Sequence, residues 1–166
     1  MDEKISAENF ITDAVNTYSD TVYRIALNIT RNPQDAFDVC QDVFVKLIKH
    51  KDKIENANHL KAWLIRVAIN CSKSLITSTY RTKVISLDEV NESELVYSGE
   101  ERLGLCETVM RLPPKYSTVI YLFYYEDMKI SDIARSLGVT ESAVKIRLSR
   151  AREKLRKILE KEHYYD

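Results

Sequence analysis

The sequence predicts an all-α protein of two small helical domains joined by an acidic linker. Apolar side chains make up 45% of the 166 residues, and most recur at the i, i+3 and i+4 spacing of amphipathic helices. The chain has only 3 Gly and 3 Pro, too few for the many turns of a β-sandwich or barrel. An acidic stretch without a helical pattern separates the two helical parts. We therefore predict domains at 1–82 and 102–166 and a linker at 83–101.

Three helices are predicted in the first domain. The first contains helically spaced apolar residues: Phe10, Ile11, Ala14, Val15, Tyr18, Val22, Ile25, Ala26 and Ile29. It ends before Asn32, which is expected to cap the second helix, and Pro33 fits that helix's first turn. The second helix is predicted to bury Ala36, Val39, Cys40, Val43, Phe44, Leu47 and Ile48. The third, from about Leu60 to Tyr80, is predicted to bury Leu60, Leu64, Val67, Ala68, Cys71 and Leu75, with Trp63 also in the core.

Four helices are predicted in the second domain. They cover residues 101–111, residues 116–125, a short segment marked by Ile130, Ile133, Ala134 and Leu137, and a longer one marked by Val144, Leu148, Ala151, Leu155 and Ile158. The last two have the pattern of a helix-turn-helix. Ala134 allows the helices to cross closely, and Gly138 permits the positive φ of a tight turn. Val144 packs the second helix on the first, and Thr140 is expected to cap it.

The predicted recognition helix presents one polar side opposite its apolar stripe: Ser142, Ile146, Ser149, Arg150 and Glu153, with Lys145 on the flank. An outward Ile146 suits contact with a thymine methyl group. Lys145 and Arg150 can reach base edges or phosphates. Arg147, Arg152 and Arg156 lie nearer the core boundary and suit phosphates or acidic neighbours. The alternatives are a helical hairpin without a DNA role and arginines that are simply solvated.

Charge is distributed unevenly although the net charge is zero. Residues 61–83 carry five basic and no acidic side chains, and residues 129–161 carry ten basic and four acidic ones. Basic stretches favour polyanions. Asn70, Lys73 and Thr77 share one face of the third helix and suit single-stranded nucleic acid, with Ile54 packing on an unstacked base. The second helix exposes an acidic face, which predicts a protein partner with a basic surface or plain solvation.

Several classes of function have no supporting pattern. No phosphate-binding Gly loop, nucleophile elbow or His-Glu metal spacing occurs, so we expect neither an enzyme nor a cofactor nor a small-molecule substrate. Cys40, Cys71 and Cys106 are too widely spaced to suggest a disulfide framework or a zinc site. The chain has no signal peptide and no apolar run that could cross a bilayer. We therefore expect a cytoplasmic protein without membrane insertion.

Three segments in this order resemble the sigma-70 family, specifically factors of the extracytoplasmic function (ECF) type. The first is VYRIALNITRNPQDAFDVCQDVFVKLIKH, in which DAFDVCQDVF is similar to the family's polymerase-binding segment. The second is HLKAWLIRVAIN, similar to the segment before the −10 recognition helix. The third is LPPKYSTVIYLFYYEDMKISDIARSLGVTESAVKIRLSRAREKL, similar to the family's fourth region.

The resemblance implies a promoter-specificity subunit of RNA polymerase. Its core-polymerase contacts would be Asp35, Asp38, Gln41 and Asp42. The melted −10 non-template strand would meet Lys53, Ile54, Asn58, Asn70 and Lys73. Duplex −35 DNA would meet Ser142, Lys145, Ile146, Ser149 and Arg150, with Arg147 and Arg152 near its phosphates. An anti-sigma factor would be a further partner. The 18 residues 84–101 reach about 60 Å when extended, which corresponds to roughly 18 base pairs of duplex.

Two other classes of function remain open at this point. A free-standing dimeric helix-turn-helix regulator would bind duplex DNA without polymerase, but it leaves the acidic face of the second helix unexplained. An adaptor that binds only proteins would tolerate charge reversal at Lys145 and Arg150.

Overall fold

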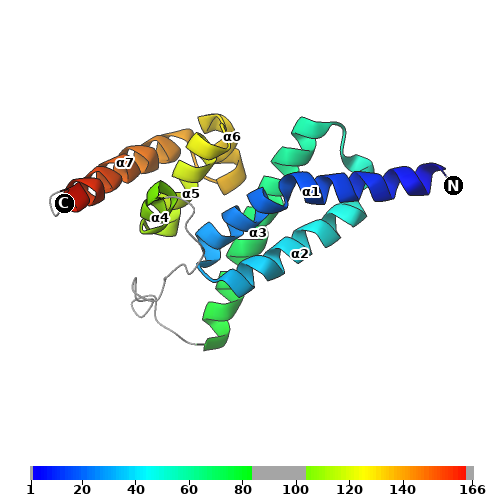
Figure 1. Cartoon of the computed structure of the whole chain (residues 1–166), viewed down its shortest axis with the longest axis horizontal. Coiled ribbons are helices and arrows are strands. Elements are labelled where there is room, and N and C mark those ends of the chain that lie inside the picture. Colours follow the sequence, from blue (N-terminus) through cyan, green and yellow to red (C-terminus); the bar gives the residue numbers. More distant parts are fainter. Residues whose placement is uncertain (1, 84–103, 164–166) are drawn as a thin grey trace. The chain divides into compact units, whose positions relative to one another are not determined.

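The computed structural model describes residues 2–83 and 104–163 and contains no strand within them (Figure 1). These residues form two compact units, one on each side of the gap. The prediction of an all-α fold with two helical domains is confirmed. The predicted linker, apart from its first residue, lies outside the described residues.

The first unit contains α1 (Asp2–Thr30), α2 (Pro33–His50), the short 3₁₀-helix η1 (Lys51–Lys53) and α3 (Ala57–Lys83). Each of the three long helices packs against the other two. The side chains that fill the space between them are nearly all aliphatic, including Val22, Ile25, Ala36, Val43, Leu47, Leu64 and Ala68. Asn32 caps α2 as predicted: its Oδ1 accepts hydrogen bonds from the backbone N–H groups of Gln34 (2.9 Å) and Asp35 (3.1 Å).

The buried stripes of α2 and α3 differ from the predicted ones. Ile48 was predicted in the core but is 50% exposed, because it lies on the side of α2 away from α1 and α3. On α3 the fully buried residues include Ile65, Ile69 and Ser72, whereas Val67, Cys71 and Leu75 are only half-buried. Because α3 packs against both α1 and α2, its buried residues are those that point between these two helices. Val67, Cys71 and Leu75 lie to one side of this stripe and line a cleft. Trp63 is also half-buried, stacked on His50 with ring centroids 4.9 Å apart.

The second unit contains α4 (Gly104–Met110), α5 (Pro114–Ile120), the π-helix η4 (Tyr121–Tyr125), α6 (Ile130–Leu137) and α7 (Glu141–His163). The helix predicted at 116–125 begins two residues earlier and widens in its last turn, where the Glu126 N–H donates to the Tyr121 carbonyl (3.2 Å). The long α7 packs against α4, α5 and α6. The buried side chains include Val119, Leu122, Ile133, Leu137, Val144, Leu148 and Ala151.

The helix-turn-helix forms as the sequence predicts. Gly138 ends α6 in the left-handed conformation, with φ 69°, where a Cβ would be disfavoured. The Val139 N–H donates to the Ala134 carbonyl (3.0 Å). The Thr140 Oγ1 caps α7 by accepting from the Ala143 N–H (3.1 Å). Val144 is fully buried. The first turn of α7 is thereby fixed on α6.

Candidate nucleic-acid and polymerase interfaces

One exposed face of α7 carries four of the seven residues predicted to contact duplex DNA. We call Ser142, Lys145, Ile146 and Ser149 the recognition face; all four are exposed, Ile146 by 50%. Because Val144 and Leu148 are buried on the opposite side, the packing of α7 fixes the direction of this face. Arg147, at its edge, is half-buried.

Two arginines of α7 have partners within the second unit. The Arg152 Nε donates to the Tyr124 hydroxyl (2.7 Å), and its guanidinium lies 5.8 Å from the centre of the Phe123 ring. Arg156 bonds to the carboxylates of Glu153 (2.7 Å) and Glu160 (3.2 Å). Arg156 thus has the acidic neighbours that were one of its two predicted roles. Arg152 is exposed and is held by two aromatic side chains of η4.

The outer side of α2 combines an apolar stripe with an acidic one. Phe37 (50% exposed), Gln41, Val45 (51%) and Ile48 (50%) follow one another at spacings of three or four residues and form what we call the docking stripe. Asp38 and Asp42 are exposed beside it, and Asp35 is half-buried in the first turn. The predicted polar residues therefore share a face with three exposed apolar side chains that the analysis had not assigned to a partner. The helical spacing of residues 37, 41, 45 and 48 could have indicated this exposed side of α2 from the sequence.

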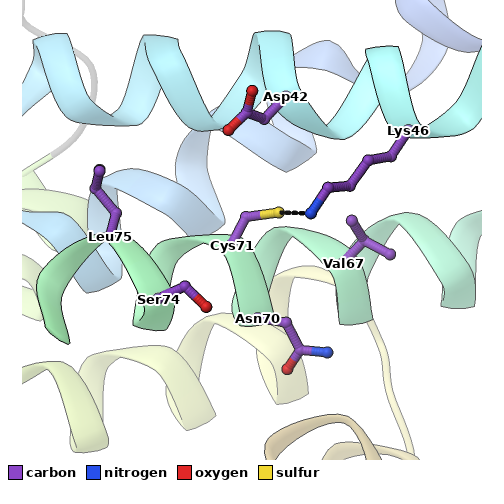
Figure 2. Close-up of a pocket in the computed structure, with 7 residues that line it drawn as sticks. All are labelled: Asp42, Lys46, Val67, Asn70, Cys71, Ser74 and Leu75. Atoms are coloured by element: carbon purple, nitrogen blue, oxygen red, sulfur yellow. Dashed lines mark hydrogen bonds between the residues drawn. The ribbon is translucent and has the colours of Figure 1, made fainter. Parts of the chain in front are cut away.

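A cleft of about 410 Å³ lies between α2 and α3 (Figure 2). Asp42 and Lys46 line it from α2, and the residues that line it from α3 are Val67, Asn70, Cys71, Ser74 and Leu75. The Lys46 Nζ donates to the Cys71 Sγ across the cleft (3.4 Å). The cleft thus brings the predicted polymerase residue Asp42 and the predicted −10 residue Asn70 to one site, together with Lys46, which the sequence analysis missed.

Of the other predicted −10 residues, Lys73 is exposed three residues after Asn70 on α3, whereas Lys53, Ile54 and Asn58 lie at or near the beginning of that helix. Asn58 is in the first turn of α3, twelve residues before Asn70, which is about 18 Å along the helix axis. Lys53 is exposed and Ile54 is half-buried in the preceding loop. His59 fixes this loop, because its Nδ1 accepts from the Glu55 N–H (3.1 Å). The structure therefore separates the predicted −10 residues into a loop group and a helix group.

Within residues 2–83 and 104–163, no three His, Cys, Asp or Glu side chains are grouped so that they could hold a metal ion. The helices of the same residues include none long and apolar enough to span a bilayer.

Comparisons with known proteins cover both units. The family model described as sigma-70 region 2 matches residues 14–82, and that described as sigma-70 region 4 matches residues 105–155. The ECF RNA polymerase sigma factor SigL of Mycobacterium tuberculosis is 30% identical over 146 residues, covering 84% of this chain and 82% of SigL. The chain belongs to the ECF sigma factors of the sigma-70 family. The RNA polymerase sigma factor SigV of Bacillus subtilis is 25% identical over 166 residues, covering 98% of each chain.

The fold of this ECF sigma factor is also similar to a solved structure. The sigma factor RpoE from Bartonella quintana, crystallised in complex with the anti-sigma factor NepR, matches with a TM-score of 0.72 and 21% identity. The match covers 90% of this chain and 96% of RpoE. Region 2 thus corresponds to the unit that contains the docking stripe and the cleft, and region 4 to the unit that contains the recognition face.

Proposed function

We propose that this ECF sigma factor is the promoter-specificity subunit of a bacterial RNA polymerase, which binds the core enzyme, recognises the −35 and −10 elements and enables transcription to start. The observation that carries this function is the match of region 2 and region 4 models to successive units of one chain. A free-standing dimeric regulator does not account for the region 2 match at residues 14–82. The chain catalyses no reaction of its own, and it acts in the cytoplasm with the polymerase.

The α2 surface is the proposed contact with the core enzyme. Half-exposed apolar side chains beside carboxylates suit a partner whose surface is apolar at the centre and basic at the edge. Asp35, Asp38, Gln41 and Asp42 provide the polar contacts, and the docking stripe adds Phe37, Val45 and Ile48. An apolar stripe of this kind provides binding energy, while the acidic residues orient the partner.

The α2–α3 cleft and the loop before α3 are the proposed contacts with the melted −10 strand. A base that leaves the duplex stack loses stacking and pairing energy, which a pocket must offset. The cleft offers the amide of Asn70, the carboxylate of Asp42 and the ammonium of Lys46 as hydrogen-bonding groups, with Val67 and Leu75 as apolar walls. Lys53, Ile54, Asn58 and Lys73 guide the strand on either side.

The recognition face of α7 is the proposed contact with the −35 duplex. Ser142, Lys145 and Ser149 contact base edges or phosphates, and Ile146 contacts a thymine methyl group. Arg150 is exposed next to this face. Arg147 and Arg152 contact the flanking phosphates. An anti-sigma factor is a further proposed partner, since the similar RpoE structure is a complex with one.

Run-off transcription with purified core polymerase and a genomic promoter library tests this function. We expect promoter-specific transcripts that disappear when the chain is omitted. Asp38→Arg should abolish association with the core enzyme while the second unit keeps its helical content, because Asp38 lies in the first unit. The matched control is Asp13→Arg, an exposed carboxylate on α1. Wild-type recovery of Asp38→Arg with the polymerase would contradict the assignment of this surface.

A further inference from the structure

Three basic side chains converge on one tyrosine at the side of the recognition helix. The Lys115 Nζ lies 5.0 Å and the Lys154 Nζ 5.5 Å from the centre of the Tyr116 ring. The positive charges of Lys115 and Arg150 both act on the Tyr116 hydroxyl and lower its pKa. We call Lys115, Arg150 and Lys154 the Tyr116 cluster. It joins the beginning of α5 to the middle of α7.

The Tyr116 cluster is positive and open to solvent. Lys115, Arg150 and Lys154 are exposed, whereas Tyr116 itself is buried. The ion pairs formed by the described residues include Arg111–Glu162 and two pairs of Arg156, but none with a member of this cluster. Like charges held together without a carboxylate repel one another, and the tyrosine ring offsets part of that cost through cation–π contacts. A bound anion would relieve the rest.

We propose that the Tyr116 cluster is a second phosphate-binding site, which holds the backbone of the duplex next to the −35 element. This inference rests on the proposed −35 function of α7. The position of Arg150 points to DNA as the anion, because Arg150 is adjacent in the chain to Ser149 of the recognition face. Lys154 lies one turn further along the same helix, about 6 Å away along the axis. Lys115 extends the basic surface onto α5, outside the helix-turn-helix.

The ionisation of Tyr116 supports a strongly positive local potential. Burial is the largest single influence and on its own raises the pKa of a phenol; here Lys115 and Arg150 outweigh it and lower the pKa of Tyr116. The same potential attracts a phosphate group. In this arrangement Tyr116 is a positioning residue, which orients the three cations of the cluster and does not itself contact DNA.

The test is the salt dependence of promoter binding by the holoenzyme assembled with the full chain. Each phosphate contact to B-DNA contributes about 0.9 to the slope of log K against log salt. We expect Lys115→Ala and Lys154→Ala each to reduce the slope by about 0.9, and the double variant by about 1.8, with unchanged preference among −35 sequences. Lys161→Ala, another exposed lysine of α7, is the matched control and should keep the wild-type slope. Lys115→Arg and Lys154→Arg, which preserve the positive charge, should also keep the wild-type slope.

The outcomes separate this inference from the function on which it rests. If the wild-type holoenzyme binds the promoter and the double variant has the same slope, the phosphate site is wrong and the −35 function stands. An unchanged slope together with weaker binding of an acidic protein partner would assign the cluster to that partner and also overturn the site. If the wild-type holoenzyme shows no promoter preference, the proposed function itself fails.

Discussion

Removing the docking stripe of α2 should weaken binding to core polymerase about 100-fold. The perturbation is the triple variant Phe37→Ala, Val45→Ala and Ile48→Ala. Each side chain is about 50% exposed, so about half of its surface is left to be covered by a partner. Full burial of a large apolar side chain contributes roughly 1.5–3 kcal/mol, and the remaining half therefore about 1 kcal/mol each. Three such losses total about 3 kcal/mol, or about two powers of ten in Kd.

The assay is a titration of fluorescently labelled full chain with purified core polymerase. Ile76→Ala is the control, since Ile76 is 40% exposed but lies on α3; we expect it to bind with wild-type affinity. A thermal unfolding curve for each variant shows whether the first unit remains folded, which is expected because alanine favours helix formation. A triple variant that is folded and binds within twofold of wild type would refute the assignment of this stripe.

Three further substitutions and one alkylation experiment test individual parts of the structure. Gly138→Ala should cost about 1–2 kcal/mol of stability in urea titrations, because φ is positive there and no neighbouring atom would clash with a Cβ. Burial and the negative charge of Asp20 raise the pKa of the Cys40 thiol to about 11 from 9.0. The protonated thiol therefore contributes to the stability of the fold below pH 9, and this contribution is lost as the pH rises through 11. Native Cys40 should resist alkylation at pH 8, as measured by peptide mass spectrometry. Asn70→Ala should reduce permanganate-detected promoter melting about fivefold through loss of about 1 kcal/mol of hydrogen bonding, with unchanged −35 binding. Tyr124→Phe should reduce affinity for −35 duplex about twofold, measured by anisotropy, because Arg152 loses the 2.7 Å hydrogen bond that orients it.

The helices, and the helix ends at Asn32 and Gly138, could be predicted because local spacing and local chemistry determine them. The turn at Asn32 depends on hydrogen bonds to residues two and three positions away. The turn at Gly138 depends on one backbone conformation. A pattern in the sequence contains that information directly.

The face of α2 that is buried could not be predicted with the same success. This helix has apolar residues on two sides: Val39, Val43 and Leu47 on one, and Phe37, Val45 and Ile48 on the other. Both sets satisfy helical spacing, so periodicity alone assigned Ile48 to the core. Only the positions of α1 and α3 determine which set is covered within the chain.

The contacts that shape the candidate sites are long-range and have no local pattern. Lys46 and Cys71 are 25 residues apart, and Arg152 and Tyr124 are 28 apart. Helical spacing identifies which side of one helix is polar, but it does not identify the residue opposite on another helix. For this reason the cleft and the Tyr116 cluster became visible only in the folded chain.

The charge distribution makes promoter selectivity depend on docking to the polymerase. A strongly basic protein would bind any DNA, because non-specific affinity rises with the number of phosphates neutralised. Here the net charge is zero, and the two basic stretches, 61–83 with five Lys and Arg and 129–161 with ten, lie in different units, so each DNA surface neutralises few phosphates alone. Under the proposed contact of α2 with the core enzyme, binding of the second surface would become intramolecular and gain from the effective concentration. Loss of the α2 contact should therefore remove promoter selectivity even when every proposed DNA-contacting side chain is intact.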